Sequence, residues 1–251
     1  MNYNAFEGIK ALYGEKVFND IVTKQYLVIG IGGVGSWICE ALARSGVQNI
    51  TIVDLDDICI SNINRQIHAT SKTIGKFKVD VMQERLREIN PNIHIKVIQD
   101  YYNQKTSQAI LDQQYDFIFD AIDSTDAKSH LISQCREKKL NIITIGAAAG
   151  LRDPSKIVIN DLNRTTQDRM LHRVRRILKK DYRFPKYTNK KFHVPAVYST
   201  EELLPISQSQ EFQATRGANC NKGLGSTSFV TASFGFIAVS YVFEKLSAQH
   251  L

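Results

Sequence analysis

A glycine-rich segment that directly follows a short apolar run constrains the fold of this chain most strongly. Residues 27–29 (Leu-Val-Ile) lead into four glycines within six positions, Gly30, Gly32, Gly33 and Gly35. Glycines at this spacing allow a tight turn, a close approach of the backbone to phosphate, and close packing of the next helix on the strand. The N-terminus of that helix then points at the bound anion. The segment therefore predicts a Rossmann-like fold that binds a nucleotide.

The stretch from residue 25 to residue 150 alternates β-branched runs with segments of helical periodicity. We expect strands near residues 26–29, 50–53, 93–98, 117–121 and 142–145, and helices near residues 34–44, 76–89, 106–111 and 127–138. This alternation is typical of a doubly wound, mainly parallel α/β sheet. A chain of 251 residues accommodates one such domain with elaborations more readily than two full domains.

Two flanking segments complete the predicted organisation. Residues 1–24 are expected to form a helical N-terminal arm, residues 25–150 the nucleotide-binding core, and residues 151–251 a C-terminal extension of the same domain. Within that extension we expect a strand near residues 157–159, a basic helix near 164–180, and an irregular polar stretch over 182–213.

Residues 223–243 raise the question of a membrane span, because these 21 residues carry no charge. Six hydroxyl side chains make the stretch polar for a bilayer: Ser226, Thr227, Ser228, Thr231, Ser233 and Ser240. A helix buried in the core or in a subunit interface is therefore favoured. Membrane association through this stretch stays open as the alternative.

The positive charge of the chain is concentrated in one stretch. Residues 164–191 contain eleven Lys or Arg against two Asp, a net charge of +9. The whole chain has a net charge of +7, so the remaining residues carry about −2. A solvated helix face is the simplest explanation of such a run. The density of charge and the interleaved His, Tyr and Phe side chains favour a surface that binds a polyanion.

The four cysteines are far apart in the sequence and form no C-x-x-C pair: Cys39, Cys59, Cys135 and Cys220. This spacing argues against a zinc ribbon and against a disulfide scaffold, and it favours a reducing, cytoplasmic location.

Residues downstream of the glycines indicate which kind of nucleotide is bound. Asp54 ends the second apolar run, 19 residues after Gly35, where a carboxylate can accept hydrogen bonds from ribose hydroxyls. Arg65 and Lys78 can hold phosphate oxygens, and Asn62 can donate nearby. A dehydrogenase needs no such clamp, so these residues favour cleavage of a triphosphate over hydride transfer.

A carboxylate for a metal ion is expected at the end of the fourth strand. Asp123 follows that strand at the carboxyl edge of the sheet, where open α/β sheets bind ligands. A single carboxylate there suits Mg²⁺, which also takes phosphate and water oxygens. Each candidate also has a structural explanation on its own: a surface ion pair for Arg65, a helix-face charge for Lys78, and a helix N-cap for Asp123. Their joint occurrence carries the prediction.

These motifs together resemble a known superfamily. Residues 30–35, 61–66 and 75–78, with Asp54 and Asp123, are similar to the ubiquitin-activating-enzyme-like adenylyltransferases, which include the enzymes that adenylate sulfur-carrier proteins. Within it the chain most resembles the tRNA threonylcarbamoyladenosine dehydratase family. That resemblance covers nearly the whole chain and rests on residues 12–16, 30–37, 64–69, 120–124, 198–201 and 230–236.

The resemblance implies a role for each candidate and a reaction. Asp54 would hold the ribose of ATP, Asn62, Arg65 and Lys78 the phosphates, and Asp123 the magnesium ion, with Arg65, Lys78 and Asp123 as the catalytic residues. A carboxylate of the substrate, beside the anticodon of a tRNA, would be adenylated and then closed by a nitrogen of the same substituent. The resemblance also implies a homodimer. The enzyme would thus be an ATP-dependent, tRNA-modifying ligase or cyclase.

One departure from the superfamily and two competing functions are left open. Many relatives carry an arginine in the N-terminal arm that reaches a neighbouring subunit's ATP, whereas here only Lys10 could replace it. An adenylyltransferase for a small sulfur-carrier protein stays open, with Cys220 passing sulfur and a cysteine-desulfurase-linked sulfur-acceptor protein as partner. An NAD-dependent oxidoreductase or a non-catalytic nucleotide-binding module would explain the glycines and Asp54 but leave Arg65, Lys78 and Asp123 without a role.

Overall fold

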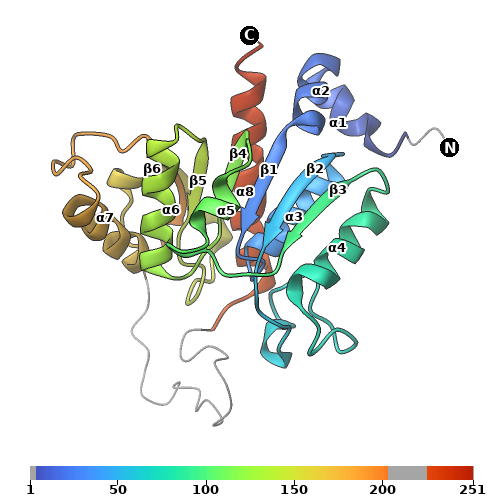
Figure 1. Cartoon of the computed structure of the whole chain (residues 1–251), viewed down its shortest axis with the longest axis horizontal. Coiled ribbons are helices and arrows are strands. Elements are labelled where there is room, and N and C mark those ends of the chain that lie inside the picture. The colour runs from blue at the N-terminus through green and yellow to red at the C-terminus, as the bar shows by residue number, and fades with distance from the viewer. Residues whose placement is uncertain (1–3, 203–224, 251) are drawn as a thin grey trace.

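A seven-stranded sheet forms the centre of the computed structural model, which describes residues 4–202 and 225–250 (Figure 1). The strands are β1 (Gln25–Ile29), β2 (Asn49–Val53), β3 (His94–Ile98), β4 (Phe117–Asp120), β5 (Ile142–Ile145), β6 (Ile157–Asp161) and β7 (Pro195–Ser199). Their order is β3-β2-β1-β4-β5-β7-β6, and every pairing is parallel except that of β6 with β7. β4 and β5 are buried along their whole length, as expected of parallel strands covered on both faces.

Helices cover both faces of the sheet. They are α1 (Glu7–Tyr13), α2 (Glu15–Thr23), α3 (Gly35–Arg44), α4 (Lys78–Ile89), α5 (Ser107–Leu111), α6 (Thr125–Glu137), α7 (Arg169–Asp181) and α8 (Ser228–Ser247). Short 3-10 turns occur at Asn4–Phe6, Ile60–Asn62, Pro154–Lys156 and Leu162–Arg164. One apolar cluster joins α2, α3, α4 and α8 to one face, and a second joins α5, α6 and α7 to the other (Figure 1). The predicted doubly wound α/β fold is confirmed.

The five core strands and four core helices lie where the sequence predicts them, to within a few residues. The expected basic helix begins only at Arg169, because the side chain of Asp168 caps it by accepting a hydrogen bond from Leu171 N at 2.8 Å. The prediction of an irregular stretch over residues 182–213 is wrong in part, since β7 lies within it. This strand is short and pairs with β5 at two positions only, so its formation depends on long-range neighbours that a local pattern does not reveal.

Helix α8 accounts for the uncharged stretch near the C-terminus. Among the described residues it alone is long and apolar enough to cross a membrane, judged by length and composition only. It packs instead against α3, where a Cβ on Gly235 would lie 3.1 Å from Ile38 N and 3.2 Å from Val34 O. Glycine thus allows the two backbones to approach closely. Burial of residues such as Val230, Phe234 and Val242 makes α8 a core helix.

Candidate functional site

The glycine-rich segment lies at the point where the strand order reverses, between β1 and β4. Gly30 has φ of +89°, and a Cβ there would lie 2.7 Å from Ala121 O at the end of β4. A Cβ on Gly35 would lie 1.8 Å from Gly30 O. No other residue fits at either position. Gly32 has room for a Cβ, with Gln66 Nε2 as its nearest neighbour at 3.9 Å, so space does not require glycine there. In open α/β sheets this switch point is the usual ligand site.

Asp54 directly follows β2 and fixes the glycine loop. Its Oδ2 accepts a hydrogen bond from Ile31 N at 2.6 Å, and its Oδ1 accepts one from Asp56 N at 2.9 Å. Burial raises the pKa of this carboxyl, while Lys78 opposes the rise. A carboxylate offers about four lone-pair sites, so Asp54 can accept further hydrogen bonds from a ligand at the loop.

Lys78, the first residue of α4, is buried beside two carboxylates. Its Nζ donates to Asp56 Oδ2 at 2.6 Å and lies 3.9 Å from Asp54 Oδ1. Tyr101, which follows β3, donates its hydroxyl to Asp56 Oδ1 at 2.5 Å. Burial alone would raise the pKa of Asp56, but the hydrogen bonds from Lys78 and Tyr101 lower it. The same hydrogen bond to Asp56 raises the pKa of Tyr101 to about 12.

Arg65 and Asn62 belong to the loop that follows β2. The aliphatic part of Arg65 lies against Gly33, whose added Cβ would be 3.5 Å from Arg65 Cδ. Arg65 Nη1 donates to Ser61 O at 2.7 Å. Asn62 is buried, and its Oδ1 accepts a hydrogen bond from Cys59 N at 3.0 Å. The structure therefore brings Arg65 to the glycine loop and uses the amide oxygen of Asn62 to hold the turn.

Contacts from α3 and α8 fix the backbone of Arg65. Trp37 Nε1 donates to Arg65 O at 2.9 Å, and Thr231 Oγ1 donates to the same oxygen at 3.2 Å. The core helix α8 thus supports the candidate site directly.

Asp123 lies just beyond β4, three residues after a buried ion pair. Lys128 Nζ lies 2.9 Å from Asp120 Oδ2, and Thr144 Oγ1 donates to the same carboxylate oxygen at 2.6 Å. This cluster fixes the end of β4. Asp123 contributes to the raised pKa of Tyr101, which places it within electrostatic reach of the Lys78 cluster. Among residues 4–202 and 225–250, no group of three or more His, Cys, Asp or Glu could hold a metal ion.

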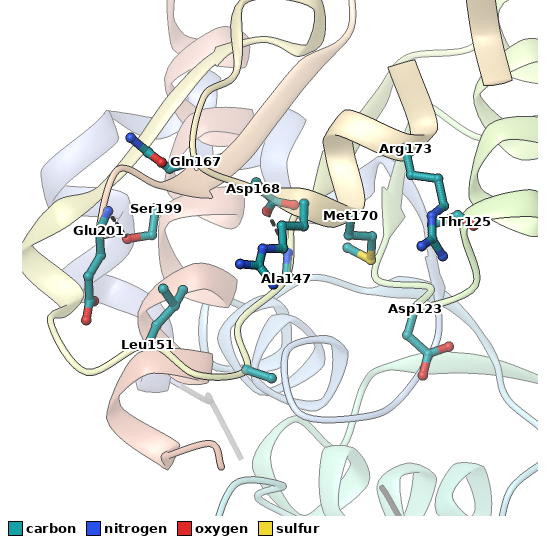
Figure 2. A pocket seen from close by; sticks show the side chains of 12 residues that line it. Asp123, Thr125, Ala147, Leu151, Gln167, Asp168, Met170, Arg173, Ser199 and Glu201 are labelled. Atoms are coloured by element: carbon teal, nitrogen blue, oxygen red, sulfur yellow. Dashed lines mark hydrogen bonds between the residues drawn. The ribbon is translucent and has the colours of Figure 1, made fainter. Parts of the chain in front are cut away.

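A pocket of about 310 Å³ opens next to Asp123, at the carboxyl ends of β4, β5 and β7 and the first turns of α7 (Figure 2). Its walls are formed by Asp123, Thr125, Ala147, Ala149, Leu151, Gln167, Asp168, Arg169, Met170, Arg173, Ser199 and Glu201. Asp168 Oδ2 accepts a hydrogen bond from Ala147 N at 2.8 Å. A Cβ on Gly146 would lie 2.1 Å from the same oxygen, so this contact requires glycine.

The sequence prediction missed three residues that shape the site. Asp56 follows Asp54 by two positions, and this carboxylate pair was the available signal. Tyr101 follows β3 at the carboxyl edge, the same edge that led to Asp123. Asp168 precedes an amphipathic run, which is a helix N-cap signal.

Other predicted residues lie away from this centre or outside the described part. Lys10 pairs with Glu15 in the N-terminal arm, at 3.1 Å. Cys220 lies outside the described residues. On α7, Arg175 is half-buried and donates to Thr165 Oγ1, so this arginine is tied to the protein itself. Arg176 and Lys180 on the same helix are exposed.

Known proteins resemble the chain over almost its full length. The sequence profile of the ThiF family matches residues 7–248. The tRNA threonylcarbamoyladenosine dehydratase of Haemophilus influenzae is 44% identical over 241 residues, which are 96% of this chain and 92% of that protein. The crystal structure of Escherichia coli tRNA N6-threonylcarbamoyladenosine dehydratase in complex with ATP has a TM-score of 0.89 and 39% identity, covering 99% of this chain and 96% of that one. Its complex with AMP has a TM-score of 0.90 and 40% identity, with the same coverage.

Proposed function

Because this chain belongs to the ThiF family, in the branch of the tRNA threonylcarbamoyladenosine dehydratases, we propose that it dehydrates N6-threonylcarbamoyladenosine beside the tRNA anticodon in an ATP-dependent reaction. One observation carries the proposal: the glycine loop, Asp54 and Lys78 converge at the switch point of the sheet. The solved ATP and AMP complexes of the Escherichia coli relative support binding of an adenine nucleotide.

Each part of the nucleotide has a matching group. Backbone N–H groups of the glycine loop and the N-terminus of α3 suit the phosphates. Asp54 accepts hydrogen bonds from the ribose hydroxyls. Arg65 and Lys78 bind phosphate oxygens, and Lys78 exchanges its contact with Asp56 for one with the nucleotide. Asn62 keeps the turn in place and contributes its amide N–H group.

The reaction needs no nucleophile from the enzyme. An oxygen of the substrate carboxylate attacks the α-phosphorus of ATP, the bond to the β-phosphate oxygen breaks, and pyrophosphate leaves. A nitrogen of the same substituent then attacks the activated carbonyl carbon, loses its proton, and expels AMP. The attacking nitrogen is tethered to its target, which gives it a high effective concentration. Cations at Arg65 and Lys78 stabilise the charge that develops on the phosphates.

A magnesium ion fits at Asp123 on the chemistry of its carboxylate. Mg²⁺ is commonly bound by one or two carboxylates, with phosphates and water as its remaining ligands, so one protein carboxylate suffices. When bound, the ion neutralises negative charge on the phosphates. We also propose that the protein is a cytoplasmic homodimer. Its basic stretch, residues 164–191, would contact tRNA phosphates.

Mass spectrometry of anticodon-loop nucleosides tests the proposal. Bulk tRNA is incubated with the protein and ATP, and threonylcarbamoyladenosine is expected to lose one water. Release of pyrophosphate that depends on tRNA excludes both the sulfur-carrier adenylyltransferase and the oxidoreductase. An unchanged nucleoside, with pyrophosphate released only when a small carrier protein is added, would contradict the proposal.

A further inference from the structure

The pocket beside Asp123 combines an apolar floor with two arginines. Leu151, Met170 and the alanines at 147 and 149 supply apolar surface, and Arg169 and Arg173 lie on the first turns of α7 (Figure 2). A volume of about 310 Å³ suits a small organic group rather than a single ion. No residue of the glycine loop lines this pocket, so the pocket is distinct from the loop, and Asp123, the proposed magnesium ligand, lies in its wall.

Two carboxylates of the pocket wall, those of Asp168 and Glu201, accept hydrogen bonds from the backbone. Asp168 accepts hydrogen bonds from Ala147 N and Leu171 N, both at 2.8 Å. Glu201 accepts from Asp153 N at 2.9 Å. These carboxylates therefore hold the walls together instead of pairing with the arginines.

The two arginines have no such partner. Within the described part of the chain, neither Arg169 nor Arg173 forms an ion pair or a hydrogen bond with another side chain. In Figure 2 the guanidinium of Arg173 lies next to Thr125, on the side of the pocket where Asp123 stands. A planar guanidinium with unused donors binds a carboxylate through two parallel hydrogen bonds.

We propose that this pocket receives the threonylcarbamoyl substituent of the modified adenosine and that Arg173 binds its carboxylate. The inference rests on the proposed function and deepens it. The apolar floor contacts the methyl-bearing part of the threonyl group, and Arg173 holds the carboxylate on the side nearest Asp123. Asp123 lies between this pocket and the proposed nucleotide site. The substrate carboxylate held by Arg173 would therefore face the α-phosphate of ATP. Arg173 is exposed like Arg176, but only Arg173 lines the pocket, so RNA phosphates are bound by the cations of α7 that do not line it, such as Arg176.

Three versions of one anticodon stem–loop RNA test this assignment: one with threonylcarbamoyladenosine, one with its methyl ester, and one with unmodified adenosine. The full-length protein is measured in the presence of a non-hydrolysable ATP analogue. Wild type is expected to bind the acid roughly 10- to 100-fold more tightly than the ester, because hydrogen bonds to a charged group discriminate by about this factor. Arg173→Gln is expected to reduce that ratio to near one, and Arg173→Lys to restore part of it.

Arg176→Gln, one turn along the same helix, is the matched control. It removes the same charge, so it should weaken binding of all three RNAs by a common factor and keep the acid-to-ester ratio. A wild-type ratio of one, or a ratio that survives Arg173→Gln, would overturn the pocket assignment. The dehydration assay with wild-type protein distinguishes failure of the pocket assignment from failure of the proposed function. If wild type removes water from the modified nucleoside of bulk tRNA but binds acid and ester equally, the proposed function stands and only the pocket assignment fails.

Discussion

Lys78, which we propose as a phosphate ligand, is a buried cation held by carboxylates of the protein itself. The residue is only 6% exposed, and its Nζ donates to Asp56 and lies near Asp54. A buried amine of this kind needs a carboxylate partner, since an unpaired charge is costly away from water. Tyr101 stabilises the partner by donating to the other oxygen of Asp56. Asp56 follows β2, Tyr101 follows β3 and Lys78 begins α4. The hydrogen bonds among these three side chains therefore also join the three elements.

Replacing Lys78 by alanine is expected to slow tRNA-dependent pyrophosphate release by about 100-fold or more, the usual effect of removing one preorganised donor. The change also leaves two carboxylates without their cation, so the free energy of unfolding should fall by about 1–3 kcal/mol. Lys76→Ala, two positions earlier and exposed, is the control and should change neither quantity. Turnover and thermal unfolding measure the two effects. Wild-type pyrophosphate release in the Lys78 variant would refute its role as a phosphate ligand.

His68 is a second buried polar residue near this cluster. It is 2% exposed, and neither ring nitrogen has a hydrogen-bond partner within the described residues. Burial first, and then Lys78 and Arg85, lower its pKa from 6.5 to about 3. The folded protein therefore holds the neutral imidazole, whereas the unfolded chain takes up a proton below pH 6.5.

Protonation of His68 in the unfolded chain is thus expected to lower the unfolding free energy of the wild type as the pH falls below 6.5. Above that pH, His68 should contribute no pH dependence. For a folded pKa near 3, the loss from pH 7 to pH 5 is about 2 kcal/mol. His68→Gln removes the titration, so its unfolding free energy should fall less over the same interval, although it starts lower. Urea unfolding of both proteins at pH 5, 6 and 7 makes the comparison. Parallel curves for the two proteins would show that His68 does not titrate in this way.

At the scale of elements, the sequence predicted the strands and turns whose formation depends mainly on neighbouring residues. Strands β1, β2, β4 and β5 are apolar runs that are largely buried, whereas the edge strand β3 is partly exposed. The glycine loop directly follows β1, which is the order that a local pattern can reveal. β7 was missed because two long-range pairings, with β5 and β6, create a strand from a run of five residues. Asp54 lies at the end of the second strand, as the sequence predicts, but the hydrogen bond that it accepts from Ile31 N joins residues 23 positions apart. The Asp56–Tyr101 bond joins residues 45 positions apart, and no sequence spacing announces it.

The glycines of the loop differ in what they tolerate, which gives a prediction for the β1–α3 turn. Gly35→Ala places a methyl group 1.8 Å from Gly30 O, so the turn must distort and the protein should lose about 2–4 kcal/mol of stability. Gly32→Ala meets nothing nearer than 3.9 Å and should keep the wild-type melting temperature. If the Gly32 backbone approaches phosphate, this variant will still bind ATP more weakly. Calorimetric melting and ATP titration separate the two effects, and equal destabilisation by both substitutions would contradict the geometry.

At the scale of the whole molecule, the excess positive charge belongs to one stretch, residues 164–191, which carry eleven Lys or Arg against two Asp. The stretch 164–191 includes α7, which packs on α6 beside the β5-β7-β6 end, while β3 forms the opposite edge (Figure 1). The stretch has a net charge of +9 against +7 for the whole chain, so the excess positive charge lies at this end. Under the proposed function, a tRNA attracted to this end would bring its modified base toward the pocket beside Asp123, so the charge would orient the tRNA as well as attract it.

The exposed cations of this end can be tested as a group by salt dependence. Replacing four of them by glutamine should weaken tRNA binding and flatten the plot of log Kd against log salt by about 0.7–0.9 for each phosphate contact removed. The four are Arg176, Lys180, Lys190 and Lys191, all exposed in the structure. Arg175 is left in place because its guanidinium is held by Thr165, and its loss would disturb the helix rather than the surface. A double variant at the β3 end, Arg87→Gln with Lys96→Gln, is the control for charge alone and should leave the slope unchanged. Two outcomes would show that tRNA does not bind through residues 164–191: a wild-type slope in the four-residue variant, or an equal flattening of the slope in the control. In either case the pocket beside Asp123 would have to receive its substrate from another direction.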